Sequence, residues 1–206
     1  MRHQRLRPLS LGAAADVVVA SRALTTFLGL LSSRPRPEVL ELGPAIGSNI
    51  TFLGEQFGCR IHVKDLFADL DRHAKEAALH RLPEFLERTF GECDQSIDAV
   101  LCWDVFDYLT PVSASVLAGR VMRVLKPGGA LLAFFGAGRP GEACYTRFFI
   151  EHGTHLRFRS SPGVCGRQRM LENRDIVRLF AGLELFDSVL LRSGIREVIF
   201  RKPSAH

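Results

Sequence analysis

The sequence predicts an α/β fold, in which a mostly parallel sheet is flanked by helices and ends in an antiparallel hairpin at the C-terminal side. Short apolar segments alternate with helical segments from Glu38 onward. Strands separated by helices of about ten residues join by right-handed crossovers into a parallel sheet. A glycine-rich turn follows the first of these strands. Two apolar segments near the C-terminus flank Ser193 and Gly194, a turn tight enough to make that pair of strands antiparallel.

Composition agrees with a globular protein that has a substantial core. The chain has 206 residues, of which 47% are hydrophobic and 24% charged, which excludes a disordered chain. No segment approaches the roughly 20 apolar residues of a membrane span. The net charge of +5 is too modest to indicate a nucleic-acid partner. We predict a helical extension over residues 1–36 and a domain over residues 37–206, and the sequence does not indicate an oligomeric state.

Cysteine usage and the N-terminus favour a cytoplasmic protein. The five cysteines form an odd and scattered set without a C-x-x-C pair or a zinc-like Cys/His spacing. We therefore expect free thiols in a reducing compartment and no metal. Asp16 and Arg22 lie in or just after the apolar N-terminal region, which argues against a signal peptide.

The expected elements follow from apolar periodicity, proline positions and capping residues. In chain order they are one or two helices over 9–31, a strand over 39–42, a helix over 48–57 capped by Ser48 or Asn49, a strand over 61–65, helices over 69–80 and 83–89, a strand over 97–103, a helix from Thr110 to Val124, a strand over 130–135, a hairpin of 144–151 with 154–159, a helix from Asn173 (its cap) to about Gly182, and antiparallel strands over 184–192 and 195–202.

The turn after the first strand is the most informative segment. Small residues stand at positions 43, 45 and 47, where they allow a sharp strand-to-helix turn and close approach of a ligand. The following helix directs its free amides and positive dipole end toward the same place. Ligands of open α/β sheets bind at the carboxyl ends of the strands, where this turn lies.

An acidic residue lies at the matching position of the second strand. Asp65 ends that strand 22 residues after Gly43, and an acid at about this distance accepts hydrogen bonds from ribose hydroxyls. Strand, turn, helix, strand and acid in this order predict a ligand that contains a nucleoside. The alternative is an ordinary tight turn followed by an exposed acid at a strand end.

The segment 39–47 resembles the first motif of class I S-adenosylmethionine-dependent methyltransferases, in particular the type 11 family. Asp65 matches the acid of their second strand, residues 97–109 resemble their fourth strand and the loop after it, and residues 123–131 contain their LKPGG turn. The likeness covers roughly residues 37–137, and the LKPGG turn is its most specific part. It implies a Rossmann-like fold, an enzyme that transfers a methyl group, and S-adenosyl-L-methionine as the cofactor.

The resemblance also implies positions for cofactor contacts. Glu41 would orient the amino group of the cofactor, Asp65 would hold the ribose, and Leu66 with Phe67 would flank the adenine. The residues expected to bind the cofactor are Glu41, Gly43, Ala45, Gly47, Asn49, Asp65, Leu66, Phe67, Cys102 and Trp103.

Two features depart from the family pattern. Ala45 replaces the middle glycine of the first motif, which adds a methyl group where the cofactor packs closely. Residues 82–94 are helical in character where the family has a third strand and an adenine contact. Glu92, Cys93 or Asp94 are the candidates to replace that contact.

Residues after the fourth strand are the catalytic candidates. Asp104 is the first candidate for a base or an acceptor-orienting group, and Tyr108 is the second; the alternative for Asp104 is a helix-capping or solvated acid. We expect a substrate lid over residues 138–172. Eight arginines against four acidic residues between positions 139 and 178 indicate either capture of an anionic small-molecule acceptor or an ordinary solvated face. Phe148, Phe149 and Phe158 are expected to pack the lid hairpin.

Three function classes compete. We favour methyl transfer from S-adenosyl-L-methionine to a small-molecule acceptor. A relative that keeps the fold as a non-catalytic binding or scaffolding module is the second hypothesis. A nicotinamide-dependent oxidoreductase is the third, although G-P-A-I-G-S differs from the dinucleotide fingerprint G-x-G-x-x-G.

Overall fold

The computed structural model describes residues 17–136, 143–168, 171–191 and 194–204. A six-stranded sheet with the order β3-β2-β4-β5-β9-β8 forms its centre. The strands β2, β3, β4 and β5 are mutually parallel, whereas β9 is antiparallel to β5 and β8 is antiparallel to β9. The predicted α/β fold with a C-terminal antiparallel hairpin is confirmed. The strands are β2 (Glu38–Glu41), β3 (Arg60–Val63), β4 (Ile97–Trp103), β5 (Leu125–Phe135), β8 (Glu184–Leu190) and β9 (Arg196–Arg201).

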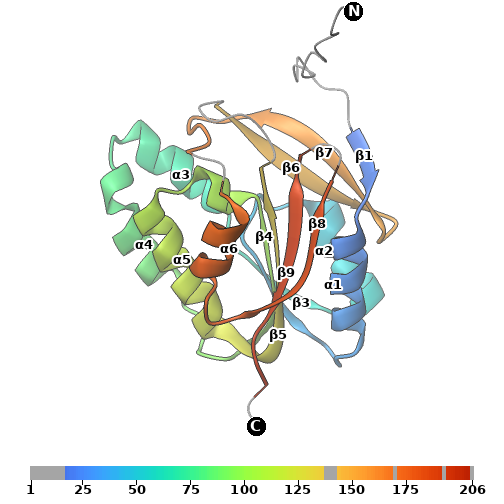
Figure 1. The fold of residues 1–206 in the computed structure, drawn as a ribbon. Coiled ribbons are helices and arrows are strands. Elements are labelled where there is room, and N and C mark those ends of the chain that lie inside the picture. Colours follow the sequence, from blue (N-terminus) through green and yellow to red (C-terminus); the bar gives the residue numbers. More distant parts are fainter. Residues whose placement is uncertain (1–16, 137–142, 169–170, 192–193, 205–206) are drawn as a thin grey trace, which may run out of the picture.

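Helices cover both faces of this sheet (Figure 1). The first face carries two helices and the second face carries four. Their apolar sides pack against β4 and β5, whose side chains are almost entirely buried, so each face has its own hydrophobic cluster. The first face bears α1 (Arg22–Ser32) and α2 (Gly47–Phe57), and the second bears α3 (Leu66–Lys75), α4 (Leu82–Thr89), α5 (Pro111–Val124) and α6 (Asn173–Leu179).

The edge of the sheet beyond β3 confirms one predicted departure from the family pattern. In the part of the chain that the structure describes, no strand pairs with the outer side of β3. The segment between β3 and β4 instead forms α3, the short helix η1 (Leu79–Arg81) and α4. Pro83 stands in the first turn of α4, where a missing amide donor costs nothing.

A second, smaller sheet lies across the top of the molecule in Figure 1. It consists of β1 (Val17–Ala20), β7 (His155–Pro162) and β6 (Cys144–Glu151), all antiparallel. The predicted hairpin around His152 and Gly153 is therefore confirmed. Both residues have left-handed backbone angles, with φ of 52° and 72°, as the turn requires.

The N-terminal region is less helical than predicted. Residues 17–20 form a strand rather than part of a helix, because three consecutive β-branched valines favour extended backbone and pair with β7. Helix α1 begins only at Arg22, after Ser21 caps it. Its apolar side is buried against the sheet. The rest of the predicted helical segment, residues 9–16, lies outside the described residues.

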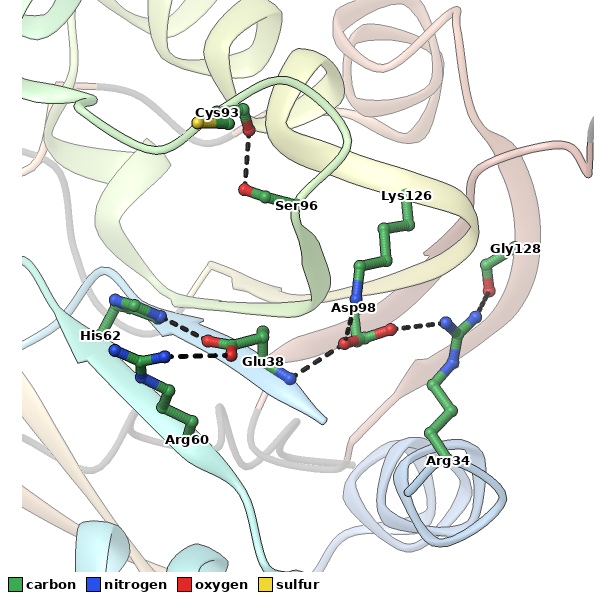
Figure 2. Close-up of polar contacts among 9 residues, drawn as sticks. All are labelled: Arg34, Glu38, Arg60, His62, Cys93, Ser96, Asp98, Lys126 and Gly128. Carbon is green, nitrogen blue, oxygen red and sulfur yellow. Dashed lines mark hydrogen bonds and ion pairs between the residues drawn. The ribbon is translucent and has the colours of Figure 1, made fainter. Parts of the chain in front are cut away.

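A charge cluster joins the amino ends of the strands, as Figure 2 shows. The Asp98 carboxylate accepts hydrogen bonds from Arg34 at 2.6 Å, Lys126 at 2.7 Å and the backbone N–H of Glu38 at 2.9 Å. Burial raises the pKa of Asp98, but these three donors outweigh it, so the pKa lies below its ordinary value. The LKPGG turn lies beside the cluster, and a Cβ at Gly129 would stand 2.8 Å from the Lys126 carbonyl oxygen. The motif is thus needed to start β5 beside β4.

Three predicted helix starts are corrected. Ile46 is the N-cap residue of α2, so neither Ser48 nor Asn49 caps that helix. Glu172 precedes α6 and makes no side-chain capping bond, so Asn173 is the first helical residue rather than the cap. The helix expected over 69–80 begins at Leu66 and ends at Lys75, because Asp65 caps it by accepting from the Ala68 N–H. Thr110 caps α5 as predicted.

Candidate functional site

The turn from β2 to α2 lies at the carboxyl edge of the parallel strands, and its first glycine is needed for packing. A Cβ placed at Gly43 would stand 2.4 Å from Cδ1 of Trp103, so no other residue fits there without displacing the indole. Gly47, in contrast, has open space around its Cβ position. Ala45 and Gly47 are exposed, whereas Gly43 is buried. The turn therefore has one face in solvent and one face filled by Trp103.

Glu41 ends β2 directly below this turn and is fully buried. Its Oε1 accepts a hydrogen bond of 3.0 Å from Nε1 of Trp103. Its Oε2 has no hydrogen-bond partner among the residues that the structure describes. Burial raises the pKa of Glu41 to about 7, against the opposing effect of the Trp103 hydrogen bond. A buried acid with an unused oxygen at a ligand-binding edge is a candidate binding group.

Trp103 ends β4 and lies between the turn and the small sheet. Its ring stacks on Phe148 of β6, with the ring centres 5.2 Å apart and an interplanar angle of 6°. The side chain is 1% exposed. Its backbone has a φ of 46°, a left-handed angle that is strained for a large aromatic residue. Such strain occurs most often at functional positions.

The lid hairpin β6–β7 is held over this edge by contacts from two helices. From α2, Asn49 donates to the carbonyl of Phe148 at 2.8 Å and accepts from the Ile150 N–H at 2.9 Å. From α3, Asp71 accepts from the hydroxyl of Tyr145 and from the Val164 N–H at 2.9 Å. Asn49 thus anchors the lid in this structure.

The catalytic candidates lie in a buried ionic cluster. Arg167, in the segment after β7, donates to Asp104 at 2.8 Å and to Asp107 at 2.9 Å, and these three side chains are at most 3% exposed. Burial raises the pKa of Asp104, although Arg167 opposes the shift. Oδ1 of Asp104 accepts no hydrogen bond in the described part of the chain. Asp104 is therefore not solvated. It stands at the N-cap position of the short helix η2 (Val105–Tyr108), but its side chain makes no capping hydrogen bond.

Tyr108 contacts the same cluster. Its hydroxyl donates to the Cys144 carbonyl at 2.9 Å, and the Arg167 guanidinium lies 4.7 Å from the centre of its ring. Burial raises the pKa of Tyr108 far above its ordinary value, so the hydroxyl stays protonated. The structure thus brings both catalytic candidates together with an arginine that sequence reasoning treated as one of eight on a basic lid.

The predicted ribose acid is accessible. Asp65 is partly exposed at the start of α3, and its backbone neighbour Lys64 donates to the Glu41 carbonyl at 2.8 Å. Glu41, at the end of β2, and Asp65, two residues after the end of β3, therefore lie at the same edge. Leu66 and Phe67, the predicted adenine contacts, are buried, and Phe67 packs 4.6 Å from the Tyr145 ring centre.

The remaining predicted contacts are dispersed. The Cys102 side chain is buried in the hydrophobic cluster on the opposite face from Trp103. Of the three candidates for the adenine end, Glu92 pairs with Lys64 at 3.0 Å, Asp94 pairs with Arg123 at 3.0 Å, and Cys93 is exposed.

Sequence reasoning missed the roles of Asn49 and Arg167 in holding the lid. Both contacts join residues that lie about 60 to 100 positions apart, and no local pattern records such a distance. Phe148 was expected to pack the hairpin, and it also covers Trp103. Asn49 is the third residue of α2, where its side chain cannot cap the helix. A polar amide at this position is the one sequence signal for a contact to another segment.

The hydrogen-bond acceptors at this edge fit an adenosyl amino-acid cofactor, but the Trp103 side chain fills the space beside Gly43. Glu41 has a free buried oxygen for an ammonium group, and Asp65 has an accessible carboxylate for ribose hydroxyls. Trp103 occupies the close approach that Gly43 permits. No group of three or more His, Cys, Asp or Glu side chains suited to a metal occurs among the described residues. The helices that the structure describes include none long and apolar enough to cross a membrane.

Comparison with known proteins gives one family match and many similar solved structures. A family model described as a methyltransferase domain matches residues 40–133. No curated protein sequence matches the chain. Among solved structures, 1,6-didemethyltoxoflavin-N1-methyltransferase from Burkholderia thailandensis, with bound 1,6-didemethyltoxoflavin and S-adenosylhomocysteine, is 17% identical over 89% of this chain and 78% of its own, with a TM-score of 0.52.

Two further structures show how widely the fold is used. The PH0226 protein from Pyrococcus horikoshii is 18% identical over 87% of this chain and 88% of its own, with a TM-score of 0.56. The [4+2]-cyclase SpnF is 14% identical over 88% of this chain and 81% of its own, with a TM-score of 0.52. At these identities the likeness concerns the fold alone. The predicted resemblance is confirmed as a likeness: residues 40–133 match a methyltransferase-domain model, and the solved structures share the mostly parallel α/β fold.

Proposed function

We propose that the protein transfers a methyl group from S-adenosyl-L-methionine to a small-molecule acceptor. The observation that carries this proposal is the pair of acids at one sheet edge within the matched domain. Glu41 ends β2 and Asp65 follows β3. The turn at the same edge has open space beside Gly47, whereas the space beside Gly43 is filled by Trp103. One acid suits an ammonium group and the other suits ribose hydroxyls.

The cofactor supplies an activated methyl group, because its sulfonium departs as a neutral thioether. The protein's part is therefore mainly to bind and orient, and alignment alone can lower a barrier by about 7–11 kcal/mol in favourable cases. We expect Glu41 and Asp65 to hold the two ends, with Gly43, Ala45 and Gly47 lining the turn. We expect the hairpin β6–β7 to limit the access of water to the reacting groups once both ligands are bound.

Asp104 is the proposed group for an acceptor that must lose a proton. Its Oδ1 is available to take the proton, and its raised pKa brings it toward the range useful for general bases. Tyr108 stays protonated and acts as a donor to orient groups near Asp104. Arg167 then keeps the remaining charge of the cluster paired.

The proposal of a small-molecule acceptor has stronger support than the proposal that this acceptor is anionic. The toxoflavin enzyme binds a small heteroaromatic acceptor on the same fold. An anionic acceptor is the more specific proposal, and its support is the arginines of the lid. Arg147 is paired in register with Arg159, and both are exposed, on the strand face opposite to the buried Phe148. Arg167 is buried, and Asp104 and Asp107 already pair with it.

Substitution of Asp65 tests the proposal. Asp65→Ala should weaken binding of S-adenosylhomocysteine at least about tenfold, since hydrogen bonds to a charged acceptor contribute about 1.5–3 kcal/mol. The variant also removes the α3 cap. Asp65→Ser is the matched variant, because serine caps equally well but loses the carboxylate. We expect both variants to bind weakly by calorimetry, with Asp65→Ser more stable. Wild-type affinity in both would place the ligand elsewhere.

The non-catalytic hypothesis has one specific observation in its favour, namely the indole that fills the crevice. SpnF has the same fold and is a [4+2]-cyclase. A scintillation assay with methyl-labelled donor and a panel of small heteroaromatic and anionic acceptors separates the hypotheses. Cofactor binding without transfer to any acceptor would favour the binding module. The predicted cytoplasmic location awaits a fractionation experiment.

A further inference from the structure

The Trp103 side chain occupies two positions that the proposed cofactor would use, one beside Gly43 and one at the Glu41 carboxylate. Its Cδ1 lies where only a glycine at position 43 leaves room. Its Nε1 donates to Glu41, the acid whose proposed partner is the ammonium group of the cofactor. Both contacts come from one side chain, so they are lost or kept together.

We propose that Trp103 is a gate residue: its indole occupies the amino-acid end of the cofactor site in the free protein and must leave Gly43 and Glu41 before the cofactor binds. This inference rests on the proposed function. The indole N–H substitutes for the ammonium group as a donor to a buried carboxylate. Without such a substitute, the free protein would hold both oxygens of Glu41 buried and unpaired, at a considerable cost in free energy.

The backbone of Trp103 supports a residue with two positions. A φ of 46° is unfavourable for a tryptophan at a strand end. Three contacts offset this cost: the stacked ring of Phe148, the neighbouring ring of Phe134 at 5.7 Å, and the Glu41 hydrogen bond. Loss of the last contact to a competing ammonium group removes part of what holds the strained conformation.

The lid limits where the indole can move. Phe148 covers it from β6, and Asn49 anchors that strand through two buried hydrogen bonds. Displacement of the indole therefore requires the Phe148 ring to shift as well. The turn itself remains accessible, since Ala45 and Gly47 are exposed, so a ligand can reach this edge before the indole leaves.

The chain provides its own reporter for this motion, because Trp103 is its single tryptophan. A buried, stacked indole that moves toward solvent shifts its emission to longer wavelength. We expect S-adenosylhomocysteine to shift the emission of the wild-type protein with single-site saturation. Calorimetry on the same samples gives the affinity independently of fluorescence.

Two variants open the gate, and a third serves as their control. Trp103→Ala removes the occupant and should bind S-adenosylhomocysteine at least about tenfold more tightly, because the competent state no longer has to be populated first. Phe148→Ala keeps the reporter but removes the covering ring, and its emission should shift at lower ligand concentration. Phe180→Ala deletes a buried aromatic ring of the opposite cluster and should leave the affinity unchanged despite a loss of stability.

The outcomes separate this inference from the proposed function. Tighter binding in Trp103→Ala supports the gate whether or not the wild-type protein binds detectably. Equal affinity in wild type and both gate variants, with an unchanged wild-type emission, overturns the gate and leaves the proposed function intact. Absence of binding in the wild type and in every folded gate variant overturns the proposed function itself. If Trp103→Ala does not fold, the gate is tested by the affinity of Phe148→Ala and by the emission shift of the wild-type protein.

Discussion

Buried acids lie at both ends of the parallel strands, at the amino ends (the amino edge) and at the carboxyl ends (the carboxyl edge). The hydrogen bonding and the pKa shifts of these acids differ between the two edges. At the amino edge, Asp98 receives three hydrogen bonds, two of them from cations, and its pKa is lowered (Figure 2). At the carboxyl edge, Glu41 and Asp104 each have an oxygen without a partner among the described residues, and their pKa values are raised.

The difference separates a structural cluster from a functional one. The amino edge ties the linker before β2 to the starts of β2, β4 and β5, and each of these contacts stabilises the fold. The carboxyl edge keeps buried acids that are incompletely paired, at a cost in stability. Proteins retain such groups mainly where a ligand or a reaction uses them.

The largest expected effect is at the carboxyl edge. Arg167→Met leaves Asp104 and Asp107 buried without their cation, which should lower the free energy of unfolding by about 3–5 kcal/mol. Urea denaturation at pH 7 measures it. The loss should shrink as the pH falls toward 4, since protonation neutralises the carboxylates, and Asp104→Asn combined with Arg167→Met should be more stable than Arg167→Met alone. A loss below about 1 kcal/mol would contradict a buried ionic cluster.

The next largest effect is an increase in the free energy of unfolding, caused by a substitution of Glu41. The pKa of Glu41 is about 7 in the folded protein against 4.5 ordinarily, so its contribution to stability is complete below pH 4.5 and is lost as the pH rises through about 7. Glu41→Gln avoids this loss and keeps an oxygen for the Trp103 N–H. It should therefore be more stable than wild type at pH 8, by on the order of 3 kcal/mol, and equal to it near pH 4.

The matched control for Glu41→Gln is Asp98→Asn at the other edge. The pKa of Asp98 is lowered, so its contribution is present above its ordinary value of 3.8 and is lost as the pH falls through the folded value. Asp98→Asn should therefore destabilise the protein at pH 7, by about 1–3 kcal/mol. Thermal melts across pH 4–8 test both variants, and shifts of the same sign at pH 8 would break the comparison between the edges.

The smallest expected loss of stability comes from Arg34, the partly exposed cation at the amino edge, which is compared with the buried Arg167 at the carboxyl edge. Arg34→Ala removes one cation from Asp98, but Lys126 and the Glu38 N–H remain, and the Arg34 side chain is 28% exposed. We expect a loss of about 1 kcal/mol or less, which added salt reduces further. If this loss equals that of Arg167→Met in chemical denaturation, solvent access does not explain the difference between the two cations.

Much of the fold follows from local sequence. The apolar run of β4 and the Thr110–Pro111 start of α5 specify their elements by period and by cap, and the structure confirms both. The LKPGG residues, expected as a turn before a strand over 130–135, instead form the first part of β5, with a register shift against β4. The β1 strand is the main exception, because its residues are extended only in the presence of β7. Short segments next to a partner strand take their structure from pairing rather than from propensity.

The candidate site divides in the same way. The sequence by itself determined which groups stand at the carboxyl edge, since Glu41, Gly43 and Asp65 follow from the alternation of strands and helices and from a spacing along one chain. Only the tertiary structure decided what fills that edge. Trp103 contacts Phe148, 45 positions away, and Arg167 pairs with Asp104, 63 positions away. Both contacts form only when the hairpin and the segment after it pack onto the sheet. Close packing of side chains from distant segments fills this edge, and no local sequence pattern describes that packing.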